Sequence, residues 1–143
     1  MKVESILNAK GREVKAIGPA ATLATAAQRL RMERIGALVV LDSDRIVGII
    51  SERDIVHAFA ADSERAGDIE VAVVMTRNVI SCGMEDSLTR VLGLMTRHRI
   101  RHLPVMQDSR LHGLISIGDV VKYRLDELEL EASVLRDSYF AGR

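Results

Sequence analysis

The sequence is poor in aromatic residues: it has no tryptophan, and all aromatic residues together make up 3% of the chain. Any core must therefore be built from Ile, Leu, Val, Ala and Met. The single cysteine, Cys82, cannot form an internal disulfide, which is typical of proteins in the reducing cytoplasm. The longest apolar stretches span about six residues, whereas a membrane helix needs ~20, and the N-terminus has no signal-peptide pattern. We therefore expect a soluble, cytoplasmic protein.

The formal net charge is zero, because 20 basic residues balance 20 acidic ones. Non-specific binding to nucleic acid or to an anionic membrane needs a basic surface, so neither partner is favoured. The chain has 143 residues, of which 48% are hydrophobic and 28% charged, which argues against disorder. Such a chain can form one compact domain or two small units that share a core.

An internal repeat becomes visible when the chain is compared with itself at an offset of 65 residues. The segment 35–40 (IGALVV) aligns with 100–105 (IRHLPV), and 48–54 (GIISERD) aligns with 113–119 (GLISIGD). Roughly a dozen of about 45 positions are identical without a gap, where chance gives roughly two or three. We infer that the chain contains a duplication.

Each copy predicts the order strand, helix, strand, strand, helix. The segments 13–17 and 78–82 are short and compatible with β-structure, and Thr22 or Ser87 then precedes a helix as its N-cap. Apolar residues recur along each of these helices at spacings of three, one and three, which places them on one face. They are Leu23, Ala26, Ala27 and Leu30 in the first copy, and Leu88, Val91, Leu92 and Met95 in the second.

The remaining strands of each copy form a predicted hairpin with a tight polar turn, and a second helix begins at Ser51 or Ser116. A three-stranded sheet leaves one face to be covered, which two such units can do for each other. The predicted fold is therefore α/β (α+β), with two tandem β-α-β-β-α repeats packed sheet to sheet with pseudo-two-fold symmetry, and a long C-terminal helix.

We divide the chain into three ranges. Residues 1–66 hold an N-terminal helix and the first repeat, 67–124 hold the second repeat, and 125–143 form a C-terminal helical extension. The N-terminal helix should turn Val3, Ile6 and Leu7 inward and end at Gly11. The apolar segment 68–77 should form a short helix that packs against the following repeat.

The C-terminal helix carries an apolar row at coiled-coil spacing. No glycine or proline occurs between Asp119 and Gly142, and the apolar residues are separated by 4, 3, 4, 3 and 4 positions. The row consists of Val121, Leu125, Leu128, Ala132, Leu135 and Tyr139. This row is too long for one small unit to cover, so we expect the helix to pack against its counterpart in a second chain and form a homodimer.

The Ser-x-x-Asp motif at 51–54 and 116–119 permits two interpretations. In the first, it is a capping box: the serine oxygen accepts a helix N–H, and the acid sits where the helix dipole favours negative charge. A capping box prefers Glu or Gln, however, because the side chain must reach back, and both copies use the shorter Asp. In the second interpretation, helix N–H groups attract a phosphate and the carboxylate holds the hydroxyls of a ribose.

A duplicated motif follows each predicted hairpin: a glycine, two aliphatic residues and then Ser-x-x-Asp. This motif resembles that of the CBS domain pair, or Bateman module. The segments RIGALVVLDSDRIVGIISERDIV and RIRHLPVMQDSRLHGLISIGDVV both look like the second half of a CBS motif. The likeness covers nearly the whole chain except the N-terminal helix and the C-terminal tail. It is closest to small free-standing bacterial CBS pairs, since no catalytic or membrane domain fits in this length.

The resemblance implies that an adenosyl ligand such as AMP, ADP, ATP, NAD or S-adenosylmethionine lies in clefts between the repeats. It assigns the ribose hydroxyls to the aspartates and places the serines near ribose and phosphate. It assigns the adenine to main chain and aliphatic side chains. By position the ribose and phosphate residues are Ser51, Asp54, Ser116 and Asp119, and the adenine residues are Ile80, Ser81, His102, Leu103 and Pro104.

The two clefts should differ. Lys15 stands at the position of Ile80, and Val39 stands at that of Pro104, so the apolar adenine slot is better formed in the second repeat. We expect the Asp119 site to bind more tightly. Arg53 has Gly118 as its counterpart and can reach a phosphate of a ligand held mainly by the other repeat.

The segment 97–102 (RHRIRH) is strongly basic. It can be a solvated helix end whose cations suit the helix C-terminus, or Arg101 and His102, with Arg99, can contact ligand phosphates. A nucleic-acid patch is the weakest alternative, because the chain has no net positive charge and few aromatic residues for stacking.

No motif predicts catalysis. His98 and His102 lack a carboxylate that would complete a metal site, Cys82 has no evident partner base, and no phosphate-binding glycine loop is present. We therefore expect a protein that is not an enzyme and has no catalytic cofactor or metal. The leading hypothesis is a nucleotide-sensing regulatory module that signals in trans to another protein. The alternative is a ligand-independent structural dimerisation module. The sequence leaves open the ligand, the number of occupied clefts, the regulated partner and the dimer orientation.

Overall fold

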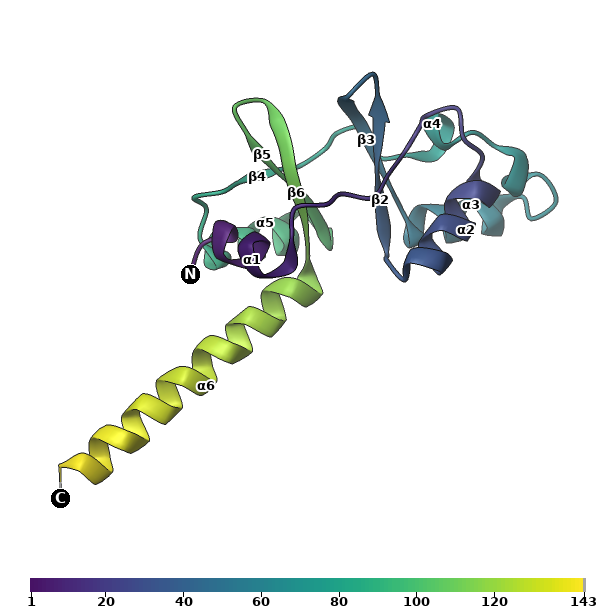
Figure 1. Ribbon diagram of the computed structural model, residues 1–143. Coiled ribbons are helices and arrows are strands. Elements are labelled where there is room, and N and C mark those ends of the chain that lie inside the picture. The colour runs from purple at the N-terminus through teal and green to yellow at the C-terminus, as the bar shows by residue number, and fades with distance from the viewer. Residues whose placement is uncertain (143) are drawn as a thin grey trace. The chain divides into compact units, whose positions relative to one another are not determined.

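A computed structural model describes residues 1–142 (Figure 1), and the chain forms two compact units. The first comprises residues 13–81, and the second combines residues 1–12 with the chain from residue 82 onward. Each unit contains a three-stranded sheet, ordered β1-β2-β3 or β4-β5-β6, in which a parallel pair is followed by an antiparallel hairpin. The predicted mixed α/β repeat is confirmed.

The first unit has the predicted element order plus two short helical segments at its end. Its elements are β1 (Ala16–Ile17), α2 (Leu23–Glu33), β2 (Ala37–Asp42), β3 (Arg45–Ser51), α3 (Glu52–Ala61), the 3-10 turn η1 (Ala66–Asp68) and α4 (Val71–Val74). The second unit repeats the order. Its elements are α1 (Val3–Lys10), β4 (Cys82–Gly83), α5 (Leu88–His98), β5 (His102–Gln107), β6 (Arg110–Ser116) and α6 (Ile117–Ala141). The first strands are shorter than the predicted segments 13–17 and 78–82, because only two residues of each pair with the neighbouring strand.

Local sequence explains the helix starts and the hairpin turns. Thr22 Oγ1 accepts a hydrogen bond from the Thr25 N–H (3.2 Å) at the start of α2, and Ser87 Oγ accepts one from the Arg90 N–H (3.1 Å) at the start of α5. In both hairpins the two turn residues are left-handed, with φ of 50° and 66° at 43–44 and of 51° and 62° at 108–109. Two consecutive left-handed residues match the right-handed twist of the flanking strands, so the tight turns are confirmed.

The apolar helix faces also lie as predicted. Leu23, Ala26 and Leu30 of α2 are buried, as are their counterparts on α5, while Ala27 and Leu92 at the edge of each face are half-buried. Within residues 1–142, no buried side-chain nitrogen or oxygen lacks a hydrogen-bond partner.

The short helix after the first repeat packs differently from the prediction. We expected the segment 68–77 to cover the following repeat, but Val71 and Met75 belong to the core of the first unit. Thr76 also exchanges main-chain hydrogen bonds with Ile49 at the edge of β3 (2.9 and 3.0 Å). Gly48 makes this approach possible, since a Cβ there would lie 2.6 Å from Met75 Sδ. The prediction was wrong because the free edge of β3 offers main-chain partners that apolar spacing does not reveal.

The N-terminal helix α1 occupies the corresponding place in the second unit. Val3, Ile6 and Leu7 are buried and Gly11 follows the helix with φ 103°, as predicted. A Cβ on Gly113 would lie 2.7 Å from Leu7 Cδ2, so this glycine lets α1 lie directly on β6. The predicted range 1–66 grouped α1 with the first repeat, because the two are adjacent in the sequence. In the structure α1 packs on the second repeat. The boundaries between 1–66, 67–124 and 125–143 otherwise stay a prediction, and α6 continues through residue 125 without a break.

Candidate functional site

The Ser51–Asp54 junction connects β3 to α3 and is a complete capping box. The half-buried Asp54 carboxylate accepts hydrogen bonds through Oδ2 from the Ser51 N–H (2.9 Å) and the Ser51 hydroxyl (3.0 Å). The Asp54 N–H donates to Ser51 Oγ (3.3 Å), so both halves of the box are formed.

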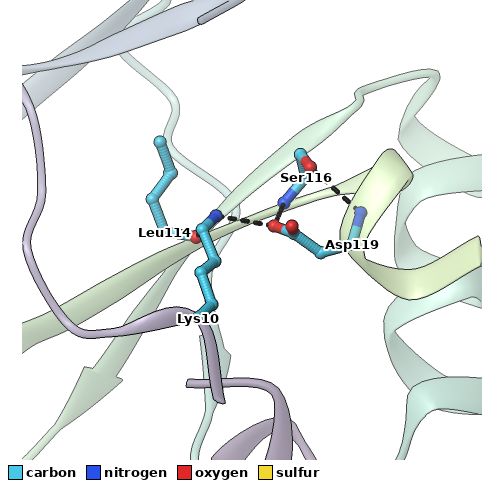
Figure 2. A network of polar contacts seen from close by, with 4 residues as sticks. All are labelled: Lys10, Leu114, Ser116 and Asp119. Atoms are coloured by element: carbon cyan, nitrogen blue, oxygen red, sulfur yellow. Dashed lines mark hydrogen bonds and ion pairs between the residues drawn. The ribbon is translucent and has the colours of Figure 1, made fainter. Parts of the chain in front are cut away.

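The Ser116–Asp119 junction connects β6 to α6 with the same geometry (Figure 2). Asp119 Oδ2 accepts from the Ser116 N–H (2.9 Å), and the Asp119 N–H donates to Ser116 Oγ (3.2 Å). The capping interpretation is therefore confirmed for both copies. The shorter Asp side chain completes the box as well, because the extended serine backbone at the cap brings its N–H to the carboxylate.

Lys10 distinguishes the second junction from the first. Its Nζ donates to Asp119 Oδ2 (2.6 Å) and to the Leu114 carbonyl (2.7 Å), as Figure 2 shows. The first unit satisfies the matching strand-edge carbonyl, that of Ile49, with the Thr76 N–H. Thus a lysine side chain in the second unit takes the place of a main-chain donor in the first.

Sequence reasoning missed Lys10. It lies more than a hundred positions from Asp119, and nothing in its surroundings within the sequence predicts that contact. Leu7 on Gly113 fixes the position of α1 on β6, and the last turn of that helix then directs Lys10 to the junction.

The Asp119 carboxyl group is held in its charged form. Partial burial acts to raise its pKa, but the hydrogen bond from Lys10, those from Ser116 and the Lys10 charge outweigh burial, so the pKa lies below its ordinary value of 3.8. Asp119 is therefore a carboxylate at neutral pH, with Lys10 as its counter-ion.

Part of the basic segment lies next to the same junction. Helix α5 ends at His98, and Arg99 follows in the left-handed conformation with an exposed side chain. The carbonyl of Arg101 accepts from the Ile117 N–H (2.8 Å), and His102 is the strand partner of Ser116. The fold thus brings Arg101 and His102 to the start of α6, while Arg99 sits at the end of α5.

The residues expected to contact adenine divide between the two units. Leu103 and Pro104 are buried in β5. Ile80, which is half-buried, and Ser81, which is exposed, end the first unit. The adenine wall that combines these residues with His102 stays a prediction, as does a phosphate contact from the exposed Arg53 in the first turn of α3.

Other reactive groups do not form a second site. Burial and, secondarily, the nearby Asp86 carboxylate raise the pKa of Cys82 to about 12, so its thiol stays protonated and is a poor nucleophile. Within residues 1–142, no group of three or more His, Cys, Asp or Glu side chains could hold a metal ion. Over the same range, no helix combines the length and the apolar character needed to cross a membrane.

Comparisons with known proteins agree with the duplicated architecture. The family model of the CBS domain matches the chain twice, at residues 4–61 and 66–126. A 17.7 kDa protein from the bps2 3′ region of Acidianus ambivalens is 39% identical over 127 residues, which cover 87% of this chain and 74% of the relative.

Solved structures show the same similarity. The CBS-domain protein ATU1752 of Agrobacterium tumefaciens is 41% identical with a TM-score of 0.85, over 87% of this chain and 99% of that one. A Methanocaldococcus jannaschii protein, proposed to be an archaeal homologue of γ-AMPK, is 26% identical with a TM-score of 0.72, over 78% of this chain and 44% of that one. With both repeats matched by the family model and the same fold in these relatives, the chain belongs to the CBS-domain family and is a tandem CBS pair.

Proposed function

We propose that this CBS pair is a regulatory module that binds an adenosyl nucleotide such as AMP, ADP, ATP or NAD and signals to another protein. The observation that carries the proposal is the junction at the start of α6. A carboxylate (Asp119), a hydroxyl (Ser116) and the segment with Arg101 and His102 lie together there, beside the N-terminus of a 25-residue helix. A carboxylate suits ribose hydroxyls, and cations with helix N–H groups suit phosphates.

Each expected site residue then has a role. Asp119 and Asp54 hold ribose hydroxyls, with Ser116 and Ser51 beside them. Phosphate oxygens contact polar side chains from the basic segment and from α3, namely Arg53, Arg99, Arg101 and His102. Adenine lies against Ile80 and Ser81, which precede β4, and against Leu103 and Pro104 of β5.

Pro104 supports placing the better adenine site in the second repeat. In the first repeat the Val39 N–H donates to the Lys15 carbonyl (3.2 Å). Pro104 stands at the position of Val39 and has no N–H, so the Ile80 carbonyl, at the position of Lys15, lacks this donor. We assign that carbonyl to the exocyclic amine of adenine.

Lys10 adds selectivity for phosphorylated ligands. Asp119 Oδ2 already accepts from Ser116 and Lys10, so a ribose that takes both carboxylate oxygens displaces the lysine ammonium. A ligand phosphate supplies a new partner for the displaced Lys10, whereas neutral adenosine does not. AMP should therefore bind more tightly than adenosine, and Lys10→Met should reduce the difference.

Titration calorimetry with AMP, ADP, ATP, NAD and adenosine tests the proposal. We expect Asp119→Asn to weaken nucleotide binding at least tenfold and the matched Asp54→Asn to weaken it less. A ligand at 100 times its Kd should add ~2.7 kcal/mol to the free energy of unfolding, which thermal shift detects. If no adenosyl compound binds, the proposal is wrong.

The completed capping boxes favour a second candidate, a structural dimerisation module without a ligand. Here Ser51, Asp54, Ser116 and Asp119 act only as helix caps. Both aspartate substitutions would then cost ~1 kcal/mol of stability and change no affinity. Product analysis after incubation with ATP or NAD separates either candidate from an enzyme.

A further inference from the structure

Helix α6 exposes the apolar row that the sequence places at heptad spacing. We call this row the α6 seam; it consists of Val121, Leu125, Leu128, Ala132, Leu135 and Tyr139. All six are exposed, and the large side chains range from 45% exposed at Leu128 to 71% at Leu135. Six apolar residues in a line on one helix form a surface that favours burial.

The unit to which α6 belongs leaves this seam open. Val120 is buried, Tyr123 and Glu127 are half-buried, and Glu127 pairs with the N-terminal amine of Met1 (3.3 Å). At 100° per residue, the seam is turned roughly 130° from this packed face. Every described residue after Glu127 is exposed, and Figure 1 shows α6 extending away from the β4–β6 sheet. A second helix can therefore lie along the whole seam.

The charges beside the seam favour another copy of α6 as the second helix. In a parallel coiled coil, the residue at a g position, directly before an a position such as Leu125 or Ala132, faces an e position of the partner helix. That e position has a residue number five higher. This rule pairs Arg124 with Glu129 of the partner subunit, and Glu131 with Arg136 of the partner subunit. By symmetry each pair forms twice, and every one joins opposite charges. The Arg124 side chain contacts Glu127 of its own helix (2.9 Å) and is 50% exposed.

An antiparallel pair does not have this complementarity. Full overlap would place Leu128 against Ala132 of the partner subunit. Glu129 and Glu131 would then each face their own counterparts, and Lys122 would face Arg136 of the partner subunit, so like charges repel. A shift by one heptad restores opposite charges but leaves two of the six seam residues uncovered. Only the parallel, in-register pair buries the complete seam and satisfies the flanking charges.

We propose that α6 pairs with α6 of a second copy as a parallel, in-register coiled coil through the α6 seam. The proposal does not depend on nucleotide binding. Because α6 begins at the Ser116–Asp119 junction, the same rigid helix connects that junction to the dimer contact.

Cysteine cross-linking tests the orientation. In a parallel pair Leu128 faces its own counterpart, so Leu128→Cys should form a covalent dimer under mild oxidation. The exposed Leu130 lies outside the seam, and Leu130→Cys is the matched control that should cross-link far more slowly. The unsubstituted chain, whose Cys82 is buried, should not cross-link. If Leu128→Cys links no faster than the control, or links only when mixed with Ala132→Cys, the parallel pair is refuted.

Sedimentation equilibrium tests the seam itself. Leu128→Asn with Leu135→Asn should raise the dimer dissociation constant at least tenfold, whereas Leu130→Asn should leave it unchanged. All three side chains are exposed, so circular dichroism should show intact folding of the units. A dimer of unchanged strength in the double variant would overturn the proposal.

Discussion

Replacing Lys10 with methionine tests how the N-terminal helix is coupled to the Asp119 junction. The substitution keeps the aliphatic stem and removes the ammonium that contacts Asp119 (2.6 Å) and the Leu114 carbonyl (2.7 Å). The Lys10 and Asp119 side chains are 36% and 23% exposed. A fully exposed ion pair contributes ~0–1 kcal/mol, and a desolvated hydrogen bond to a charged group contributes ~1.5–3 kcal/mol. We therefore expect Lys10→Met to lower the free energy of unfolding by about 1 kcal/mol at pH 7.

The pH dependence identifies the carboxylate as the source of this loss. The pKa of Asp119 is lower in the folded chain than its ordinary value of 3.8. A lowered pKa contributes stability that is present above the unfolded-state pKa and is lost as pH falls through the folded-state pKa. The difference between Lys10→Met and the unsubstituted chain should thus be full at neutral pH and shrink below about pH 4.

Urea unfolding followed by circular dichroism measures these free energies. A double-mutant cycle with Asp119→Asn isolates the interaction, and we expect a coupling of about 1 kcal/mol. Lys2→Met is the control at the N-cap of the same helix: its partner Glu85 is 72% exposed, so the loss should be smaller. A coupling below roughly 0.3 kcal/mol, or a loss that is equal at pH 3 and pH 7, would refute the reasoning.

Three further predictions concern packing and reactivity. Gly113→Ala should cost ~1–3 kcal/mol in urea unfolding, because its Cβ would lie 2.7 Å from the buried Leu7 side chain; an unchanged midpoint would show that α1 moves freely. Gly93→Ala, an exposed position on α5 with nothing within 4 Å of the new Cβ, should stabilise the protein by ~0.5–1 kcal/mol, and a lower midpoint would contradict this. Cys82, with a pKa of about 12, should react with iodoacetamide at pH 8 only after urea unfolding, and stability should fall as pH rises above 9, the ordinary thiol value. Rapid labelling of the folded chain would refute the last prediction.

The sequence by itself determined the repeat and the parts of each unit. Helix starts at Thr22 and Ser87, the two tight turns and the buried helix faces depend on residues within a few positions of each other, so local spacing predicts them. The Ser-x-x-Asp capping boxes also depend only on residues a few positions apart. The exposed row on α6 was also visible, because its period is a property of one helix.

Only the tertiary structure decided which helix covers which sheet and what touches the key aspartate. Helix α1 lies on the second repeat and α4 on the first, because Gly113 and Gly48 admit Leu7 and Met75 to the edges of β6 and β3. That arrangement brings Lys10 to Asp119 and distinguishes two junctions that share the same capping box. Contacts between residues so far apart in the chain depend on shape and on unpaired main-chain groups at a strand edge, neither of which leaves a periodic pattern in the sequence.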